Sequence, residues 1–248
     1  MSSESSPAIE IRSLTKKYRD FIALNELDLK ISRGEIFGFL GHNGAGKTTT
    51  VNLLTTLLSP TSGTATVAGF DVIRSPMEVR RRIGYLPENV KFYDDLTSFE
   101  NLEYFARLSG IQKPASRIQS TLEFLEFTGF EKQKMGTFSK GMRQRIGIAQ
   151  AILHEPEVLF LDEPTSGLDP MGVKNLREII LKLNREKGIT LFINTHLLSE
   201  VARTCTTIGV LGHGKLIYHD TLSNTLAKFP TEDSLENIYL SLETAKTP

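Results

Sequence analysis

Residues 41–48 read Gly41-His42-Asn43-Gly44-Ala45-Gly46-Lys47-Thr48, and the predicted fold is built around them. Their spacing fits G-x-x-x-x-G-K-[ST], in which glycines let successive backbone N–H groups point at phosphate oxygens. Before the loop, the apolar run from Ile36 to Leu40 predicts a buried strand. After it, Thr48 to Leu58 predicts a helix that stops at Ser59-Pro60. A strand, a glycine-rich turn and a helix in this order favour a phosphate-binding loop over an ordinary glycine turn.

Two more apolar segments predict further strands of the same sheet. Val158 to Leu161 ends at Asp162-Glu163, and Thr190 to Asn194 ends at Thr195-His196. Because helical patterns alternate with these strands, we expect an α/β fold with a parallel sheet. Ligands of such sheets bind at the carboxyl ends of the strands. The glycine-rich loop, the two acids and His196 are therefore predicted to meet at one edge.

Shorter patterns surround this predicted sheet. Loose alternation predicts short half-buried strands within Ile9 to Lys30 and another strand from Thr64 to Val72. A hairpin is predicted where Ile208 to Leu211 and Leu216 to Tyr218 flank a glycine-containing turn. The spacing of Leu235, Ile238 and Leu242 suggests a short terminal helix.

Helical periodicity fills the region between the first and second buried strands. From Thr97 to Leu153 apolar residues recur at helical spacing, which predicts an inserted helical subdomain. Thr97 and Glu100 form a capping-box pattern, and Ser75 and Glu78 form another. Val173 to Lys187 predicts an amphipathic helix closed by Gly188.

The composition excludes some classes of function. Lysine plus arginine total 29 and aspartate plus glutamate total 29, so the formal net charge is zero, which argues against a nucleic-acid partner. The single cysteine, Cys205, excludes an internal disulfide and fits a reducing compartment. No apolar run approaches the roughly 20 residues that span a bilayer, and Met1 to Pro7 carries no apolar signal segment. We therefore expect a cytoplasmic chain that reaches a membrane only by docking onto a partner.

The polar residues at the predicted sheet edge suit phosphate chemistry. Lys47 is placed to reach the β- and γ-phosphates, and the Thr48 hydroxyl is placed to bind Mg²⁺. Asp162 offers Mg²⁺ a carboxylate, through water. Glu163 alternates away from Asp162 and is placed to polarise an attacking water molecule. The alternative is a strand that simply ends at a polar loop.

Further motifs resemble those of the ATP-binding cassette (ABC) ATPases, from Tyr18 to the final hairpin. Residues 139–145, Ser-Lys-Gly-Met-Arg-Gln-Arg, are similar to the family signature. Residues 162–170, Asp-Glu-Pro-Thr-Ser-Gly-Leu-Asp-Pro, resemble its Walker B segment and D-loop, and His196 resembles its switch histidine. The resemblance implies a P-loop NTPase with a RecA-like core, an N-terminal antiparallel β subdomain and an inserted α-helical signature subdomain. The implied divisions are 1–88, 89–156 and 157–248.

The resemblance also implies a role for each matching residue. Glu163, His196 and Lys47 would be catalytic, and Thr48, Glu88 and Asp162 would bind Mg²⁺. Tyr18 would stack on adenine, although a buried tyrosine in the first strand layer is an alternative. ATP would be held by Tyr18, Gly41, Asn43, Gly44, Ala45, Gly46, Lys47, Thr48, Thr49, Ser139, Gly141 and Asp169.

One phosphate loop and one signature imply two chains that meet head to tail, either two copies or this chain and a homologous ATPase subunit. The resemblance implies a multi-spanning membrane permease as the other partner, docked near Glu88 to Asp95. Phe92, Tyr93 and Phe99 would contact it, or belong to the local core.

Departures from the family pattern point to a subgroup. The family usually has glutamine at Glu88, and Lys140 and Met142 also differ from the usual signature. The latter two resemble cassettes that export drugs, polysaccharides or sodium, which implies an exporter. The alternatives are a soluble cassette protein of translation or DNA maintenance and a small-molecule kinase with a phosphate loop. The kinase interpretation does not explain the presence of Ser139-Lys140-Gly141 and His196.

Overall fold

The larger of two sheets forms the centre of the computed structural model, which describes residues 6–228. Its strand order is β10-β9-β3-β8-β7-β6, and all neighbours are parallel except β9 and β10. The strands are β3 (Ile36–Leu40), β6 (Ile83–Leu86), β7 (Val158–Asp162), β8 (Thr190–Asn194), β9 (Thr207–Gly212) and β10 (Lys215–Thr221). Every residue of β3, β7 and β8 is buried, which explains their continuous apolar runs. The parallel α/β prediction is confirmed.

The smaller sheet is antiparallel and has the order β2-β1-β4-β5. It contains β1 (Ile9–Tyr18), β2 (Phe21–Ile31), β4 (Ser62–Val67) and β5 (Phe70–Asp71). The single strand predicted over Thr64–Val72 is wrong, because the chain turns at Ala68-Gly69, where both residues have positive φ. The two resulting strands pair with each other through Val67 and Phe70.

Helix α1 (Lys47–Leu54) begins in the phosphate loop and is shorter than predicted. Thr56 adopts a positive φ of 62°, and the backbone N–H groups of Leu57 and Leu58 both donate to the Asn52 carbonyl. This turn closes the helix before the proline is reached. Helix α2 (Pro76–Arg82) lacks the predicted capping box, because the Glu78 carboxylate binds Arg81 and Arg82 instead of the Ser75 backbone.

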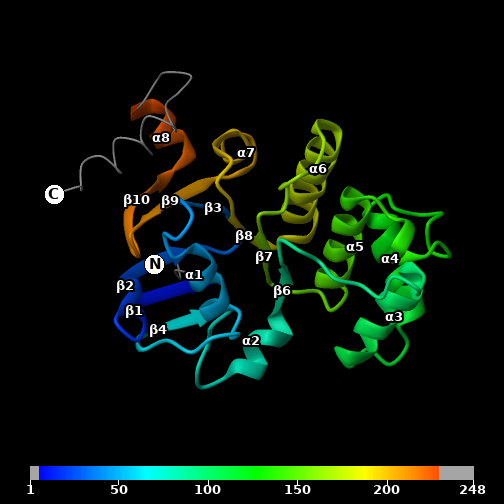
Figure 1. The fold of residues 1–248 in the computed structure, drawn as a ribbon, viewed down its shortest axis with the longest axis horizontal. Helices are drawn as coiled ribbons and strands as arrows, with labels where there is room; N and C mark the ends of the chain where they lie inside the picture. The colour runs from blue at the N-terminus through cyan, green and yellow to red at the C-terminus, as the bar shows by residue number, and fades with distance from the viewer. Residues whose placement is uncertain (1–5, 229–248) are drawn as a thin grey trace, which may run out of the picture.

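The inserted helical region contains α3 (Ser98–Leu108), α4 (Pro114–Phe124), a 3₁₀ turn at Met135–Thr137 and α5 (Lys140–Ile152). The Thr97–Glu100 capping box is confirmed, with both reciprocal hydrogen bonds present. Figure 1 shows these helices together at one end of the molecule, with the smaller sheet at the other end. The larger sheet lies between them.

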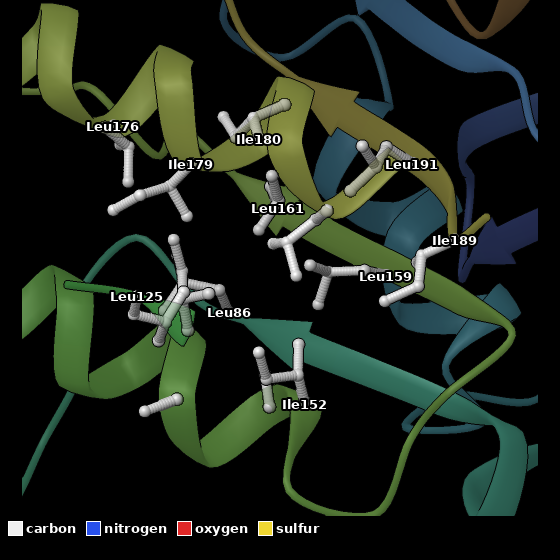
Figure 2. Packing of buried hydrophobic residues seen from close by; sticks show 14 of the residues in the cluster. Leu86, Leu125, Ile152, Leu159, Leu161, Leu176, Ile179, Ile180, Ile189 and Leu191 are labelled. Atoms are coloured by element: carbon white, nitrogen blue, oxygen red, sulfur yellow. The ribbon is translucent and has the colours of Figure 1, made fainter. Parts of the chain in front are cut away.

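Helix α6 (Pro170–Lys187) begins at the Asp169 cap, earlier than predicted, and ends as predicted at Gly188, where φ is 66°. Its apolar face packs on β7, with Ile179 and Ile180 near Leu161, as Figure 2 shows. The same buried cluster includes Leu86 of β6 and Ile152 of α5, so it joins the sheet to the helical region. This packing fixes the ends of β7 and α5 relative to each other.

Two short helices complete the described chain, α7 (Leu198–Thr204) and α8 (Leu222–Lys228). The predicted terminal helix at Leu235 to Leu242 lies outside the described residues. Within residues 6–228, no helix has the length and apolar character needed to cross a membrane.

Candidate functional site

The phosphate loop connects β3 to α1 and turns at glycines. Gly44 and Gly46 have φ values of 86° and 108°, in the region that side chains strongly disfavour. A Cβ on Gly46 would also lie 2.5 Å from the Ala23 carbonyl oxygen of β2. The loop therefore needs glycine here both for its turn and for its contact with the smaller sheet.

Lys47 lies at the start of α1, and only 6% of its surface is exposed. Its ammonium group donates to the carbonyl oxygens of Gly41 at 2.6 Å and His42 at 3.3 Å. Burial lowers the pKa of Lys47, while the nearby carboxylates of Glu163 and Asp162 oppose this effect. The cation is thus held by its own loop, close to the two acids predicted to share its site.

Asp162 is the last residue of β7, and its carboxylate is buried. Desolvation raises its pKa, and the charges of Glu163 and Glu88 raise it further. The opposing contributions are a hydrogen bond from Asn194 Nδ2, which lies 2.5 Å from Asp162 Oδ1, and the charge of Lys47. Sequence reasoning missed Asn194 as a partner, because the contact depends on the register of β7 against β8.

Glu163 follows directly and occupies a strained turn with φ of 46°. Its backbone N–H donates to the Asn194 carbonyl at 2.8 Å. Its carboxylate contacts His196, with Nδ1 2.9 Å from Oε1, and accepts a hydrogen bond from the Thr195 hydroxyl at 3.3 Å. The predicted pair of Glu163 and His196 is brought together, and residues 194–196 provide partners for both acids.

A cleft brings most of the predicted residues together. Its lining includes Tyr18, Asn43, Gly44, Gly46, Lys47, Thr48, Thr49, Glu88, Asp162, Glu163 and Asn194. Tyr18 is 42% exposed, so the alternative of a buried core tyrosine is wrong. Phe21, 62% exposed and paired with Tyr18 across the β1–β2 turn, also lines the cleft, and sequence reasoning missed it.

Ser139, Gly141 and Asp169 lie elsewhere on the same chain. They line a separate hollow with Leu168 and Asn175. The Ser139 hydroxyl caps α5 by accepting from Met142 N, and Asp169 caps α6 by accepting from Gly172 N. The structure therefore does not bring the signature residues to the cleft of their own chain.

Two neighbouring residues of α5 connect this helix to other parts of the molecule. Gln144 is buried and donates through Nε2 to the Pro164 carbonyl, 3.0 Å away in the loop after Glu163. Arg143 forms an ion pair with Asp94 at 2.7 Å. Sequence reasoning assigned neither contact. Together they link the segment around Asp94, the signature helix and the loop that carries Glu163.

The charge balance of the cleft fits a divalent cation that arrives with phosphate. The carboxylates of Asp162, Glu163 and Glu88 lie around one buried ammonium, that of Lys47. Within residues 6–228, no group of three or more His, Cys, Asp or Glu side chains is arranged to hold a metal ion alone. Mg²⁺ commonly takes only one or two carboxylates and completes its shell with phosphate oxygens and water, so this donor set suits it.

Comparison with known proteins agrees with this geometry. The family model described as ABC transporter matches residues 24–166, more than half of the chain. The chain belongs to the ABC transporter family. It is an ABC ATPase, an ATP-binding subunit that hydrolyses ATP, with a mixed α/β P-loop NTPase fold.

The relatives of this ABC ATPase cover most of its length. The bacitracin transport ATP-binding protein BcrA of Bacillus licheniformis is 43% identical over 212 residues, which are 86% of this chain and 69% of that protein. The ABC transporter ATP-binding protein NatA of Bacillus subtilis is 38% identical over 222 residues, with coverage of 88% and 89%.

Solved structures of ABC ATPases superpose closely. The structure of an ATP-binding subunit of an ABC transporter has a TM-score of 0.83 and 29% identity, and it covers 95% of this chain and 99% of that chain. A dimeric ATP-binding cassette in a post-hydrolysis state bound to ADP and Pi has a TM-score of 0.77 and 26% identity, with coverage of 86% and 98%.

Proposed function

We propose that this ATPase works as a head-to-tail pair around two ATP–Mg²⁺ and drives a separate membrane permease in the export direction. The observation that carries the proposal is the separation of two half-sites on one chain. Lys47 and Glu163 line one hollow, while Ser139 and Asp169 line another. A second copy, or a homologous subunit, turned to face the first would place a signature opposite each phosphate loop.

Each residue of the cleft has a defined task in this proposal. Lys47 exchanges the loop carbonyls for phosphate oxygens, and the backbone of residues 41–48 donates to the same phosphates. Tyr18 stacks on the adenine, with Phe21 beside it. Thr48, Glu88 and Asp162 hold Mg²⁺, which neutralises phosphate charge when bound.

Glu163 takes the proton of the attacking water molecule, and His196 holds the carboxylate in position for this step. The Ser139 hydroxyl and the N-terminus of α5, supplied by the other chain, bind the γ-phosphate. Because the γ-phosphate then contacts both chains, its loss on hydrolysis weakens the closed pair and opens it.

The segment from Glu88 to Asp95 is the proposed contact for the permease. Tyr93 is 51% exposed, and its ring meets that of Tyr104 edge to face at 5.3 Å. Phe92 and Phe99 are partly buried and pack against the core cluster, so they support this surface from beneath. The ATPase would thereby be peripheral on the cytoplasmic face of the membrane.

The names of two relatives support a role in transport, while the proposed export direction rests on the resemblance of Lys140 and Met142 to exporter cassettes. BcrA is named for bacitracin transport, and YbhF of Escherichia coli, 37% identical over 242 residues, is named as a probable multidrug ABC transporter ATP-binding protein. The division into 1–88, 89–156 and 157–248 remains part of the proposal. A soluble role in translation or DNA maintenance is not favoured by these relatives.

Complementation tests the head-to-tail pair. A Lys47→Ala chain lacks a working phosphate loop, and a Ser139→Arg chain lacks a working signature. Each is expected to be inactive alone, whereas a mixture forms pairs that contain one intact composite site and regain ATPase activity. Two Lys47→Ala preparations mixed together are the matched control. A mixture that stays inactive although both chains fold and pair would contradict the proposed arrangement.

A further inference from the structure

Asn194 is the last residue of β8 and pairs in register with Asp162, the last residue of β7. Its Nδ2 atom donates to Asp162 Oδ1 at 2.5 Å, and its backbone carbonyl accepts from Glu163 N at 2.8 Å. It also lines the cleft that contains Lys47 and Thr48. One residue thus contacts both acids of the site.

The oxygen of the Asn194 amide is buried without a donor. The residue is 1% exposed, and Oδ1 accepts no hydrogen bond from any group in residues 6–228. Leaving a buried acceptor without a donor costs free energy. A rotated amide would not remove this cost, because Oδ1 would then face the Asp162 carboxylate, which is an acceptor when ionised. The orientation is therefore fixed by Asp162.

Two neighbouring donors are engaged elsewhere. The Lys47 ammonium donates to the carbonyls of Gly41 and His42, and the Thr195 hydroxyl donates to Glu163. Because Asn194 lines the cleft, a donor for Oδ1 can arrive with a bound ligand.

We propose that Asn194 is a positioning residue for the divalent cation of this cleft. Its nitrogen holds Asp162 in one orientation, and its oxygen accepts a hydrogen bond from a water molecule bound to the cation. The inference rests on the proposed binding of ATP with Mg²⁺. Mg²⁺ retains several water molecules when bound to proteins, and groups behind the direct ligands orient them and tune affinity.

Metal affinity measured without hydrolysis tests this role. Wild type, Asn194→Ala and Asn194→Val are titrated with Mn²⁺ at a saturating concentration of the β,γ-imido analogue of ATP, and free Mn²⁺ is followed by electron paramagnetic resonance. The affinity for the same analogue is measured separately in EDTA. Asn101→Ala is the matched control, because Asn101 is a fully buried amide in α3 that bonds only to local backbone groups.

Loss of Asn194 is expected to weaken Mn²⁺ binding about 10-fold, while binding of the metal-free analogue changes by less than about twofold. Asn101→Ala should lower thermal stability and leave Mn²⁺ affinity unchanged. The valine variant keeps a side chain suited to a strand, so it carries the test if Asn194→Ala does not fold.

Two results would overturn the role of Asn194. One is unchanged Mn²⁺ affinity in the Asn194 variants, and the other is an equal loss in Asn101→Ala. A different outcome concerns the proposed function itself. If the wild type binds neither the analogue nor Mn²⁺, the proposed function is wrong. If the wild type binds both and the Asn194 variants bind them equally well, only the role of Asn194 is wrong.

Discussion

Replacing Glu163 by glutamine removes the proposed proton acceptor and changes little else. The side chain keeps its size, and the amide can still pair with His196 and Thr195, which contact the two carboxylate oxygens at 2.9 Å and 3.3 Å. General base catalysis contributes about 10²–10⁴-fold, so kcat is expected to fall by that factor. This corresponds to about 3–5 kcal/mol of barrier.

The assay is phosphate release by purified protein at saturating ATP and Mg²⁺, with nucleotide binding measured in parallel. Glu163→Gln should bind ATP as wild type does and should accumulate the closed pair, visible by size-exclusion chromatography. Glu157→Gln is the matched control, because Glu157 precedes β7 and pairs with Arg33 and Arg82 away from the cleft. A Glu163→Gln chain that keeps more than about a tenth of wild-type kcat would refute Glu163 as the general base.

Three further changes test separate parts of the structure. Asp162→Asn removes a carboxylate whose pKa is raised by desolvation, so we expect a higher melting temperature at pH 7 without nucleotide. This gain should shrink as the pH falls and Asp162 becomes protonated in the folded chain, and the Mg²⁺ dependence of ATP binding should weaken. Thr97→Ala breaks the capping box of α3 and should cost about 1 kcal/mol in urea unfolding, with Thr137→Ala as the control. Phe21→Ala should weaken ATP binding less than Tyr18→Ala does, measured with a fluorescent analogue. Equal losses would contradict the leading role of Tyr18, and no loss in either variant would remove both rings from the adenine contact.

Local sequence predicted the parts of the fold that depend on local physics. The buried strands carry continuous apolar runs, the phosphate loop needs its glycines, and Thr97 and Gly188 act at the predicted helix ends because the side chain of one and the backbone of the other suit those positions. Weaker local patterns failed where a side chain had more than one possible partner. Ser75 and Glu78 have the pattern of a capping box, but the Glu78 carboxylate forms ion pairs with Arg81 and Arg82 instead.

Sequence predicted that the phosphate loop, the two acids and His196 meet at one edge of the sheet, but it did not reveal other contacts between distant segments. The acids were assigned from their motif, but their partnership with Asn194 depends on the register of β7 against β8. Phe21 reaches the cleft because a tight turn places it opposite Tyr18. The separation of Ser139 from Lys47 follows from the packing of α5 at the far edge of the sheet, which no local pattern states.

The adjacent residues Arg143 and Gln144 connect α5 to two other segments of the molecule. Arg143 holds Asp94 on the segment proposed to meet the permease, and Gln144 holds Pro164, the residue after Glu163. Because both contacts are made by adjacent residues of α5, a displacement of the segment around Asp94 is expected to move the loop that carries Glu163. We therefore expect a permease that has bound its substrate but cannot change conformation to lower the rate of ATP hydrolysis.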